Sequence, residues 1–312
     1  MTVLVMNAMA APLIEPHLPR WVEPRYFRSA EELFELAPEA EIGWFDLYQP
    51  GGMDKAIRLA TRLKWLNSVY AGVDFFPLDV LRERGVIVTN GTGINAITIA
   101  EYVVMGMLTV AKGYREVVRS QDRHEWLLDS PGKVELAGSR ALILGYGAIG
   151  QKVERMLQGF DVDVVKVRRS QGEGTLGLDE WRGQLGTFDW VILAVPATPE
   201  TEGMIGKAEI AAMKAGSTLV NVARGSVVDQ EALIAGLKAG RPGHAFLDVV
   251  TPEPLPAKHP LWDVPNAHIT SHLSGRAQTR MFERSVTRFL ENLARFRSGK
   301  PLQPQVDLSL GY

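Results

Sequence analysis

The sequence predicts an α/β protein with two doubly wound parallel sheets, in which one domain is inserted into the chain of the other. Three observations predict this fold class. Short runs of β-branched and apolar residues alternate with helical patterns, which is typical of parallel strands joined by helices. A polar, aperiodic segment interrupts this alternation once, after which it restarts. The length of 312 residues is that of about two domains.

The first strands are predicted close to the N-terminus. The runs TVLVM, EIGWFDLYQ, LKWLNSVY and GVIVTN are strand-like. Between the first two, Ser29 and Glu32 have the spacing of a capping box ahead of an apolar pattern, which predicts a helix. The apolar run 95–113 contains Glu101 and is shorter than the ~20 residues of a membrane span. It therefore predicts a buried helix at a domain or subunit interface.

The alternation restarts after the polar segment 119–138. Strand-like runs then recur as RALILGYGAIG, VDVVKVRRS, FDWVILAVP, STLVNVARG, GHAFLDVV and AHITSH. The helical pattern at 277–300 carries one apolar stripe, ends near Gly299 and is expected to return to the first domain. We therefore expect one domain at 1–94 plus 278–312 and an inserted domain at 95–277, with an arm at about 105–138.

The composition excludes several classes of function. A net charge of −2 provides no basic field for nucleic acid. The chain has no cysteine, which excludes disulfides, thiolate metal sites and cysteine nucleophiles. The N-terminal run lacks the basic residues of a signal peptide, and the six histidines share no metal-ligand spacing. We therefore expect a cytoplasmic protein that binds no nucleic acid, no membrane and no metal.

A glycine-rich loop follows the first strand of the inserted domain. The run ALILGYGAIG places Gly145, Gly147 and Gly150 in G-x-G-x-x-G spacing between an apolar strand and a helical pattern. This is the context that a dinucleotide-binding loop requires. Gly145 permits a tight turn, Gly147 lets the backbone approach a pyrophosphate, and Gly150 lets the helix pack closely on the sheet. The inserted domain is therefore predicted to be a Rossmann-type dinucleotide-binding domain.

The next strand ends in two arginines. A site for NAD usually places an acid there, about 20 residues beyond the loop, to accept hydrogen bonds from the ribose hydroxyls. This sequence has Arg168, Arg169 and Ser170, which offer two guanidinium groups and a hydroxyl to a 2′-phosphate. The alternative interpretation is a solvated surface charge cluster. We predict that NADPH is the preferred cofactor and that NADH remains possible.

Charged side chains also follow three later strands of this domain. Arg224 follows STLVNVA, Asp248 and Glu253 follow GHAFL, and His272 follows AHITS. Ligands of doubly wound sheets bind beyond the carboxyl ends of the strands, so these side chains could converge on a nicotinamide. Taken singly, each could instead be a surface ion-pair partner, a turn cap or a loop histidine.

These motifs resemble those of the D-isomer-specific 2-hydroxyacid dehydrogenases over almost the whole chain. The resemblance includes GYGAIG, PATPETEGMIG, NVARGSVVDQEALIAGLKAG, LDVVTPEPLPAKHPLW and PNAHITSHLSG. Within the family, the AGVD segment, the length and the terminal QVDLSLGY are most similar to the glyoxylate/hydroxypyruvate reductase A type. The resemblance implies that glyoxylate, hydroxypyruvate or a similar small 2-keto acid is reduced to the D-2-hydroxy acid by hydride transfer. It also implies that 1–94 plus 278–312 form a flavodoxin-like substrate (catalytic) domain.

The resemblance assigns the catalytic roles. Arg224 would grip the substrate carboxylate, His272 would act as general acid/base, and Glu253 would favour the imidazolium form of His272. Ser271 stands where the family usually has proline, which is expected to loosen the loop that carries His272.

The resemblance also assigns binding residues. The amides of Ala71, Gly72 and Val73 would meet the substrate carboxylate, and Trp44 is expected to contact the substrate, although such an aromatic is more often part of a core. Asp248 would bind the nicotinamide carboxamide. Further cofactor contacts are expected at Ala148, Ile149, Val195, Pro196, Thr201, Val222, Ala223 and Gly275.

The arm is the predicted dimerisation element. In the family it crosses to the other subunit, so we expect a homodimer. Trp126 in the arm either reaches the active site of the partner subunit or anchors the dimer. The sequence leaves both possibilities open.

Four alternatives to this function exist. A formate dehydrogenase pairs its histidine with glutamine, whereas Glu253 is the matching residue here, and a phosphite-oxidising relative would usually keep an acid at Arg168. A dinucleotide-sensing, corepressor-like regulatory protein shares the fold and these catalytic residues. A reductase of a bulkier 2-keto acid, such as phenylpyruvate or 2-ketogluconate, is the fourth.

Overall fold

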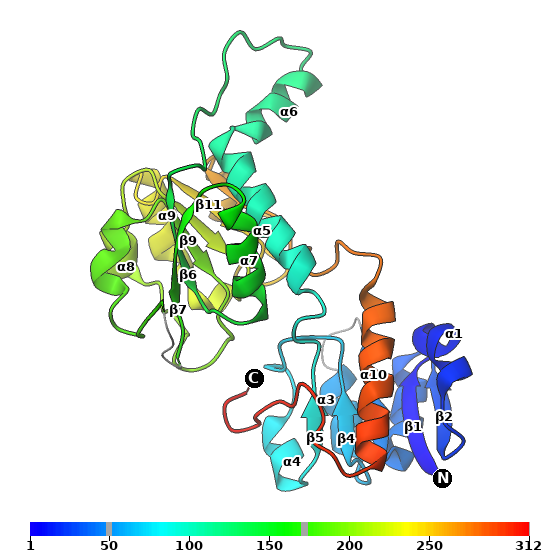
Figure 1. Ribbon diagram of the computed structural model, residues 1–312. Helices are drawn as coiled ribbons and strands as arrows, with labels where there is room; N and C mark the ends of the chain where they lie inside the picture. The colour runs from blue at the N-terminus through cyan, green and yellow to red at the C-terminus, as the bar shows by residue number, and fades with distance from the viewer. Residues whose placement is uncertain (48–51, 170–173, 312) are drawn as a thin grey trace. The chain divides into compact units, whose positions relative to one another are not determined.

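In the computed structural model the chain forms two compact units. The structure describes residues 1–47, 52–169 and 174–311. One unit comprises Met1–Asn95 and Gln278–Tyr312, and the other comprises Ala96–Ala277. Both units contain a parallel sheet with helices on its two faces, so the predicted fold class is confirmed (Figure 1).

The first unit contains a five-stranded sheet in the order β2-β1-β3-β4-β5. This is the order of flavodoxin-like folds. All of its strand pairs are parallel. The strands are β1 (Thr2–Asn7), β2 (Val22–Phe27), β3 (Ile42–Trp44), β4 (Trp65–Asn67) and β5 (Ile87–Thr89). Side chains along β1 alternate between two cores, because Leu4 and Met6 point to one face and Val5 to the other.

Helices cover both faces of this sheet. The core that contains Val5 includes residues of α2 (Ala30–Leu36), α3 (Gly52–Leu59) and α4 (Leu78–Glu83). The opposite core includes residues of α1 (Ala11–Ile14) and α10 (Met281–Arg297). The predicted capping box of α2 is half formed: Ser29 Oγ accepts from Glu32 N at 3.2 Å, but Glu32 Oε2 accepts from Arg28 N at 2.7 Å and not from the N-cap amide of Ser29.

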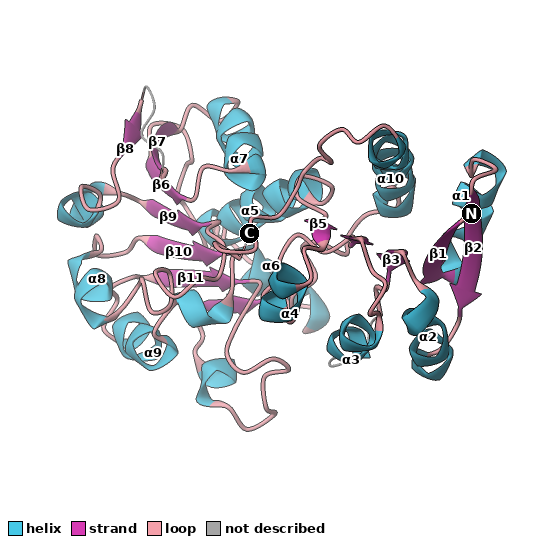
Figure 2. Cartoon of the chain, turned by 90° about the horizontal axis from the view of Figure 1, so that it is seen from below, coloured by secondary structure: helices cyan, strands magenta, loops and turns pink. Residues whose placement is uncertain are grey.

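The second unit contains a seven-stranded sheet in the order β12-β11-β10-β9-β6-β7-β8. All of its strand pairs are parallel, and the order reverses between β6 and β9, as in dinucleotide-binding folds (Figure 2). The strands are β6 (Arg140–Leu144), β7 (Asp163–Val167), β8 (Thr175–Leu176), β9 (Trp190–Leu193), β10 (Thr218–Asn221), β11 (His244–Leu247) and β12 (Ala267–Ile269).

Two layers of helices enclose this second sheet. Ala141 and Ile143 of β6 pack in a core with α5 (Ala96–Ala111) and α7 (Ala148–Gln158). Leu142 and Leu144 pack on the other face, in a core with α8 (Lys207–Ala212) and α9 (Gln230–Lys238). The loops that follow the carboxyl ends of these strands carry the candidate site.

The predicted arm at about 105–138 begins within the long apolar helix predicted at 95–113, which is α5. A second helix, α6 (Tyr114–Asp122), follows it and leads into a loop that projects from the sheet of this unit (Figure 1). Trp126 and Leu128 in this loop are 90% and 97% exposed. No single described helix is long and apolar enough to cross a membrane. Taken together, α5 and α6 are long and apolar enough by length and composition alone, but they meet at a bend of 71°.

Candidate active site

The conformation of the loop between β6 and α7 accounts for the glycine at each of three positions. Gly145 has a φ of +97°, and a Cβ at this position would lie 2.5 Å from the carbonyl oxygen of Ala194. A Cβ at Gly150 would lie 2.5 Å from the carbonyl oxygen of Gly145, so only glycine lets α7 pack this closely. A Cβ at Gly147 would meet no atom within 4 Å. The backbone at the start of α7 is thus open to a ligand, which fits a pyrophosphate.

A polar network that the sequence did not predict holds this loop. The hydroxyl of Tyr146 donates to Glu154 on α7, and Lys166 Nζ on β7 lies 2.6 Å from Glu154 Oε1. Lys166 Nζ also lies 4.8 Å from the centroid of the Tyr146 ring. The hydrogen bond to Glu154 raises the pKa of Lys166. The one signal in the sequence was a lysine inside an otherwise apolar strand.

The two arginines lie where the sequence placed them, directly after β7. Both are exposed, and Arg169 Nη2 lies 3.3 Å from Glu200 Oε1. Such an exposed ion pair contributes little to stability. Ser170, which was predicted to act with them, lies outside the described residues.

The loop after β9 contains further predicted cofactor contacts. Thr201 Oγ1 donates to Pro196 O at 2.7 Å and accepts from Thr198 N at 2.9 Å, which fixes the turn. The remaining predicted contacts lie at the start of α7 or just beyond strands β9 and β10 and near the His272 loop, and these are Ala148, Ile149, Val195, Val222, Ala223 and Gly275.

Glu253 and His272 form a direct pair. Glu253 Oε2 lies 2.7 Å from His272 Nδ1, and Glu253 Oε1 accepts from Val250 N at 3.0 Å. Burial opposes ionisation of Glu253, but the hydrogen bonds from His272 and Val250 and the charges of His272 and Arg224 together lower the pKa of Glu253. The carboxylate thus orients the imidazole through Nδ1. This arrangement allows Nε2 to exchange a proton with a ligand.

Arg224 follows β10 in a turn held by a buried asparagine. Asn221 Nδ2 donates to Arg224 O at 2.9 Å, and Asn221 Oδ1 accepts from Ala223 N at 3.0 Å. Arg224 Nη1 donates to Ala223 O at 2.9 Å. Because its charge lowers the pKa of Glu253, the structure brings Arg224 into the neighbourhood of the Glu253–His272 pair.

Asp248 organises the loop that carries His272. Its side chain is buried, and its carboxylate accepts from Thr270 Oγ1 at 2.6 Å, from Leu273 N at 3.0 Å and from the amide and hydroxyl of Ser274. Asp248 O also accepts from His272 N at 2.6 Å. The sequence did not predict this task. The predicted contact of Asp248 with the nicotinamide carboxamide stays a prediction.

The departure at Ser271 has a local explanation. Ser271 and His272 have φ values of +53° and +56°, in the left-handed region. Proline, whose φ is fixed near −65°, cannot adopt this conformation. The four hydrogen-bonding groups that Asp248 engages in this loop argue against the expected loosening.

The segment 71–73 lies in the first unit, after β4. Within the described residues, the amides of Ala71, Gly72 and Val73 donate no hydrogen bond to a protein acceptor. The segment is held instead through its carbonyl groups, because Asn90 Nδ2 donates to Ala71 O at 2.6 Å. Adjacent free amides of this kind can bind an anion.

Trp44 is a core residue of the same unit. Its side chain is 2% exposed, and its ring lies 5.0 Å from that of Phe289. Its Nε1 donates to Asp46 Oδ2 at 2.7 Å. This placement argues against the predicted contact with substrate, because the strand end is packed against α10, and we do not propose that contact.

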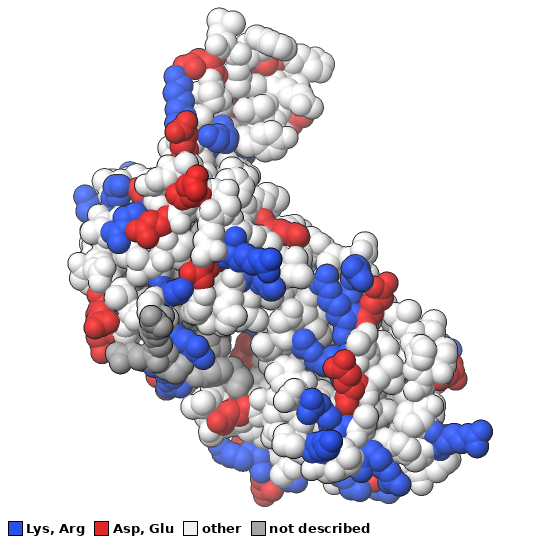
Figure 3. Space-filling model, viewed as in Figure 1, with Lys and Arg blue, Asp and Glu red and all other residues white. Residues whose placement is uncertain are grey.

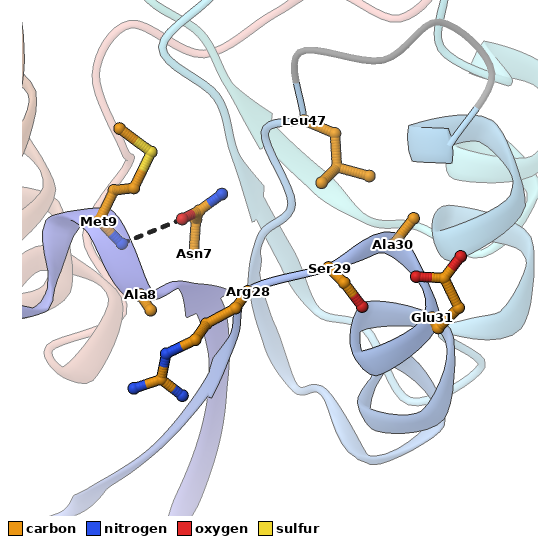
Figure 4. A pocket seen from close by; sticks show the side chains of 8 residues that line it. All are labelled: Asn7, Ala8, Met9, Arg28, Ser29, Ala30, Glu31 and Leu47. Atoms are coloured by element: carbon orange, nitrogen blue, oxygen red, sulfur yellow. Dashed lines mark hydrogen bonds between the residues drawn. The ribbon is translucent and has the colours of Figure 1, made fainter.

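A pocket of about 590 Å³ lies in the first unit beyond the carboxyl ends of β1 and β2 (Figure 4). The charged residues that line it are Arg28 and Glu31, and both are exposed.

Among the described residues, no three His, Asp or Glu side chains are grouped to hold a metal ion. Basic and acidic side chains are interspersed on the face shown in Figure 3.

Comparisons with known proteins place this geometry in a family. The model of the D-isomer specific 2-hydroxyacid dehydrogenase NAD binding domain matches residues 104–274. The D-3-phosphoglycerate dehydrogenase of Archaeoglobus fulgidus is 31% identical over 295 residues, which are 92% of this chain and 55% of that protein. The chain thus spans about half the length of the D-3-phosphoglycerate dehydrogenases that it matches. Glyoxylate/hydroxypyruvate reductase B of Pectobacterium carotovorum is 32% identical over 260 residues, which are 80% of this chain and 81% of that protein.

Solved structures agree with the family model. A D-isomer specific 2-hydroxyacid dehydrogenase family protein from Aeromonas salmonicida matches with a TM-score of 0.87 and 30% identity, over 98% of this chain and 99% of that chain. A D-isomer specific 2-hydroxyacid dehydrogenase from Xanthobacter autotrophicus, in complex with NADPH and MES, matches with a TM-score of 0.78 and 27% identity, over 100% and 99%. The chain therefore belongs to the D-isomer-specific 2-hydroxyacid dehydrogenases, a family of oxidoreductases.

Proposed function

We propose that the protein is an NADPH-dependent reductase that converts a small 2-keto acid, glyoxylate or hydroxypyruvate, into the D-2-hydroxy acid. The observation that carries the proposal is the Glu253–His272 pair with Arg224 in its neighbourhood. This pair lies at the carboxyl edge of the sheet that also carries the glycine loop. The name of the Pectobacterium relative supports the substrate class.

The reaction adds a hydride to the carbonyl carbon and a proton to the carbonyl oxygen of the keto acid. When bound, NADPH supplies the hydride. His272 donates the proton from Nε2, because its Nδ1 is engaged with Glu253. Glu253 stabilises the imidazolium before the proton is transferred. Arg224 binds the substrate carboxylate through its guanidinium and stabilises the negative charge that develops on the carbonyl oxygen.

Backbone amides of the first unit complete the proposed binding of the substrate. We assign the substrate carboxylate to the amides of Ala71, Gly72 and Val73, which have no protein acceptor within the described residues. Backbone donors bind an anion without a second cation, and their direction is fixed by the fold.

The cofactor preference rests on the end of β7. Arg168 and Arg169 are both exposed, and a guanidinium can bind a phosphate through two parallel hydrogen bonds. For Arg169, the phosphate would compete with the ion pair to Glu200. The open backbone at Gly147 fits the pyrophosphate. The Xanthobacter relative, which was solved with NADPH, supports this choice.

The first test compares initial rates with glyoxylate and hydroxypyruvate, each with NADPH and NADH at matched subsaturating concentrations. Hydrogen bonds to a charged group contribute about 1.5–3 kcal/mol, so we expect NADPH to be preferred at least ~10-fold. Equal rates with the two cofactors would remove the arginine argument. If neither acid is reduced, a panel separates a bulkier substrate from a sensing protein, which turns over none of its members. The panel contains phenylpyruvate and 2-ketogluconate, tested for reduction, and 3-phosphoglycerate, tested for oxidation with NADP⁺ and NAD⁺.

An arginine variant tests the cofactor assignment separately. Arg168→Ala is expected to raise the KM for NADPH at least ~10-fold and to leave the KM for NADH within about twofold, because NADH lacks the 2′-phosphate. Arg155→Ala, which removes an exposed arginine of α7, is the matched control. A similar loss with both cofactors would show that Arg168 does not bind the 2′-phosphate.

Two further predictions belong to this proposal. We propose that the protein is a homodimer, because the arm exposes Trp126 and Leu128, and large exposed apolar side chains often mark an interface. We also propose that it acts in the cytoplasm, as the sequence suggested. The subgroup within the family stays a prediction.

A further inference from the structure

A half-buried carboxylate lies next to the segment that we assign to the substrate carboxylate. Asp46 follows β3, and its side chain accepts three hydrogen bonds of 2.7 Å, from Trp44 Nε1, Ser68 Oγ and Val69 N. Its backbone oxygen accepts from Asn7 Nδ2 at 3.3 Å. Asp46 therefore joins the ends of three neighbouring strands, β1, β3 and β4.

All the donors to this carboxylate are neutral. Desolvation by burial raises the pKa of Asp46 to about 6, although the bonds from Ser68, Val69 and Trp44 act in the opposite direction. Other titratable groups on the adjoining segments are Arg28 and Glu31 after β2 and Tyr70 after β4. The Tyr70 hydroxyl donates to Leu47 O at 3.2 Å, and none of these three groups contributes to the shift in the pKa of Asp46.

The hydrogen bonds continue from Asp46 towards Ala71. Ser68 Oγ, which donates to Asp46, accepts from Tyr70 N at 3.1 Å. On the other side, Tyr70 O accepts from Gly91 N at 2.7 Å, and Ala71 O accepts from Asn90 Nδ2. The segment 68–71 is thus fixed at both sides of the chain. These bonds engage the amide and carbonyl of Tyr70 and the carbonyl of Ala71, whereas the amides of Ala71, Gly72 and Val73 donate to no protein acceptor within the described residues.

We propose that Asp46 is a positioning residue for substrate binding. By fixing Ser68 and Val69, it sets the direction in which the amides of 71–73 point towards the substrate carboxylate. This inference rests on the proposed function. It predicts an effect on the KM for the keto acid and little effect on kcat, because the chemical step depends on Arg224 and His272.

If Asp46 acted on the substrate through its charge, Asp46→Asn would change the KM for the keto acid in the opposite direction. A charged Asp46 repels a substrate carboxylate, so removing the charge would lower KM if that repulsion dominated. A positioning role raises KM in the same variant, because the uncharged side chain no longer accepts all three hydrogen bonds. The direction of the change therefore separates the two roles.

The variant Asp46→Asn is measured with the preferred 2-keto acid at saturating NADPH. We expect the KM for the keto acid to rise about 10-fold, with kcat and the Kd for NADPH changed less than about twofold. Glu41→Gln is the matched control, since Glu41 lies at the amino end of β3 and pairs with Lys64 at 2.6 Å. We expect it to leave KM unchanged. An unchanged or lowered KM in Asp46→Asn overturns the proposal.

A second variant and a spectroscopic readout cover loss of folding. Ser68→Ala removes one donor without altering the carboxylate, and we expect it to raise KM about threefold. The indole N–H of Trp44, observed in ¹⁵N-labelled protein and assigned with Trp44→Phe, should titrate near pH 6 in the wild type and should not titrate in Asp46→Asn.

The outcomes distinguish this inference from the proposed function. Turnover by the wild type with an unchanged KM in both variants overturns the positioning role and leaves the function standing. A wild type that reduces no 2-keto acid overturns the function and this inference with it. An indole resonance with the same chemical shift and pH dependence in the wild type and in Asp46→Asn overturns the contact itself, whatever the turnover.

Discussion

At the scale of single residues, the candidate site depends on a pair in which a carboxylate orients the side chain proposed to transfer the proton. Glu253 engages Nδ1 of His272, which leaves Nε2 as the ring nitrogen that can exchange a proton with a ligand. We expect His272→Gln to lower kcat by roughly 10²–10⁴, the usual contribution of general acid catalysis, with the Kd for NADPH changed less than about twofold. His17→Gln, at an exposed histidine of the first unit, is the control. A His272→Gln enzyme with the kcat of the wild type would remove His272 from the mechanism.

The charged form of Asp46 opposes folding. Its pKa is about 6 in the folded protein and near 3.8 in the unfolded chain. A group with a raised folded pKa contributes stability below pH 4 that is lost as the pH rises through 6. Two pKa units correspond to about 3 kcal/mol. We therefore expect the free energy of unfolding of Asp46→Asn, relative to the wild type, to increase by about that amount between pH 4 and pH 7.5.

Denaturant unfolding of both proteins across this range checks the prediction. The difference between the two proteins cancels the other titrating groups, which the substitution does not touch. A difference that is constant with pH would mean that Asp46 titrates alike in the folded and unfolded chains.

At the scale of elements, the sequence predicted where strands occur but overestimated their length. The run EIGWFDLYQ was expected to be a strand, yet β3 contains only Ile42–Trp44, and the end of the run lies outside the described residues. The pairing of β3 with its neighbours stops just before Asp46, whose side chain accepts hydrogen bonds from Ser68 and Val69 after β4. A strand pattern records apolar burial, and it cannot show that a polar side chain will end the strand by binding a neighbour.

The site was predicted unevenly for the same reason. Arg224, Glu253 and His272 stand in contiguous motifs, so their positions could be read from the chain. The networks of Asp46 with Val69 and of Asp248 with Ser274 join residues 23 and 26 positions apart. No local pattern specifies such contacts, because they arise only when strands that are separate in sequence become neighbours in the sheet.

Two positions of the glycine loop require glycine for different physical reasons, so substitutions there should have different effects. Gly150→Ala is expected to lower the free energy of unfolding by about 1–3 kcal/mol, since its Cβ would lie 2.5 Å from a backbone oxygen. Gly147→Ala is expected to leave thermal stability nearly unchanged, because its Cβ would enter open space, and to weaken NADPH binding at least ~10-fold. Melting curves and cofactor titrations of the two variants test this division. Equal loss of stability in both would contradict it.

At the scale of the whole chain, the insertion was predictable from the last helix. The apolar stripe at 277–300 needs a core, and Phe289 of α10 packs against Trp65 of β4 with ring centroids 4.8 Å apart. The chain thus leaves the first unit at Asn95 and returns to it at Gln278. The assignment of substrate and cofactor roles to the two units follows from the proposed function and is tested with it.

The arm makes the last prediction, on the oligomeric state. Trp126 and Leu128 are almost fully exposed in the single chain, and a large aromatic buries 150–250 Å² when it is covered. We expect the wild type to sediment as a dimer, with twice the 34.4 kDa mass of the chain, and the double variant Trp126→Glu, Leu128→Glu to sediment as a single chain at micromolar concentration. Leu178→Glu, which changes an exposed leucine outside the arm, should leave the dimer intact. A wild type that is a single chain would contradict the dimer. A dimeric double variant that has lost activity would instead place these two side chains at the reaction, which is the other possibility that the sequence left open for Trp126.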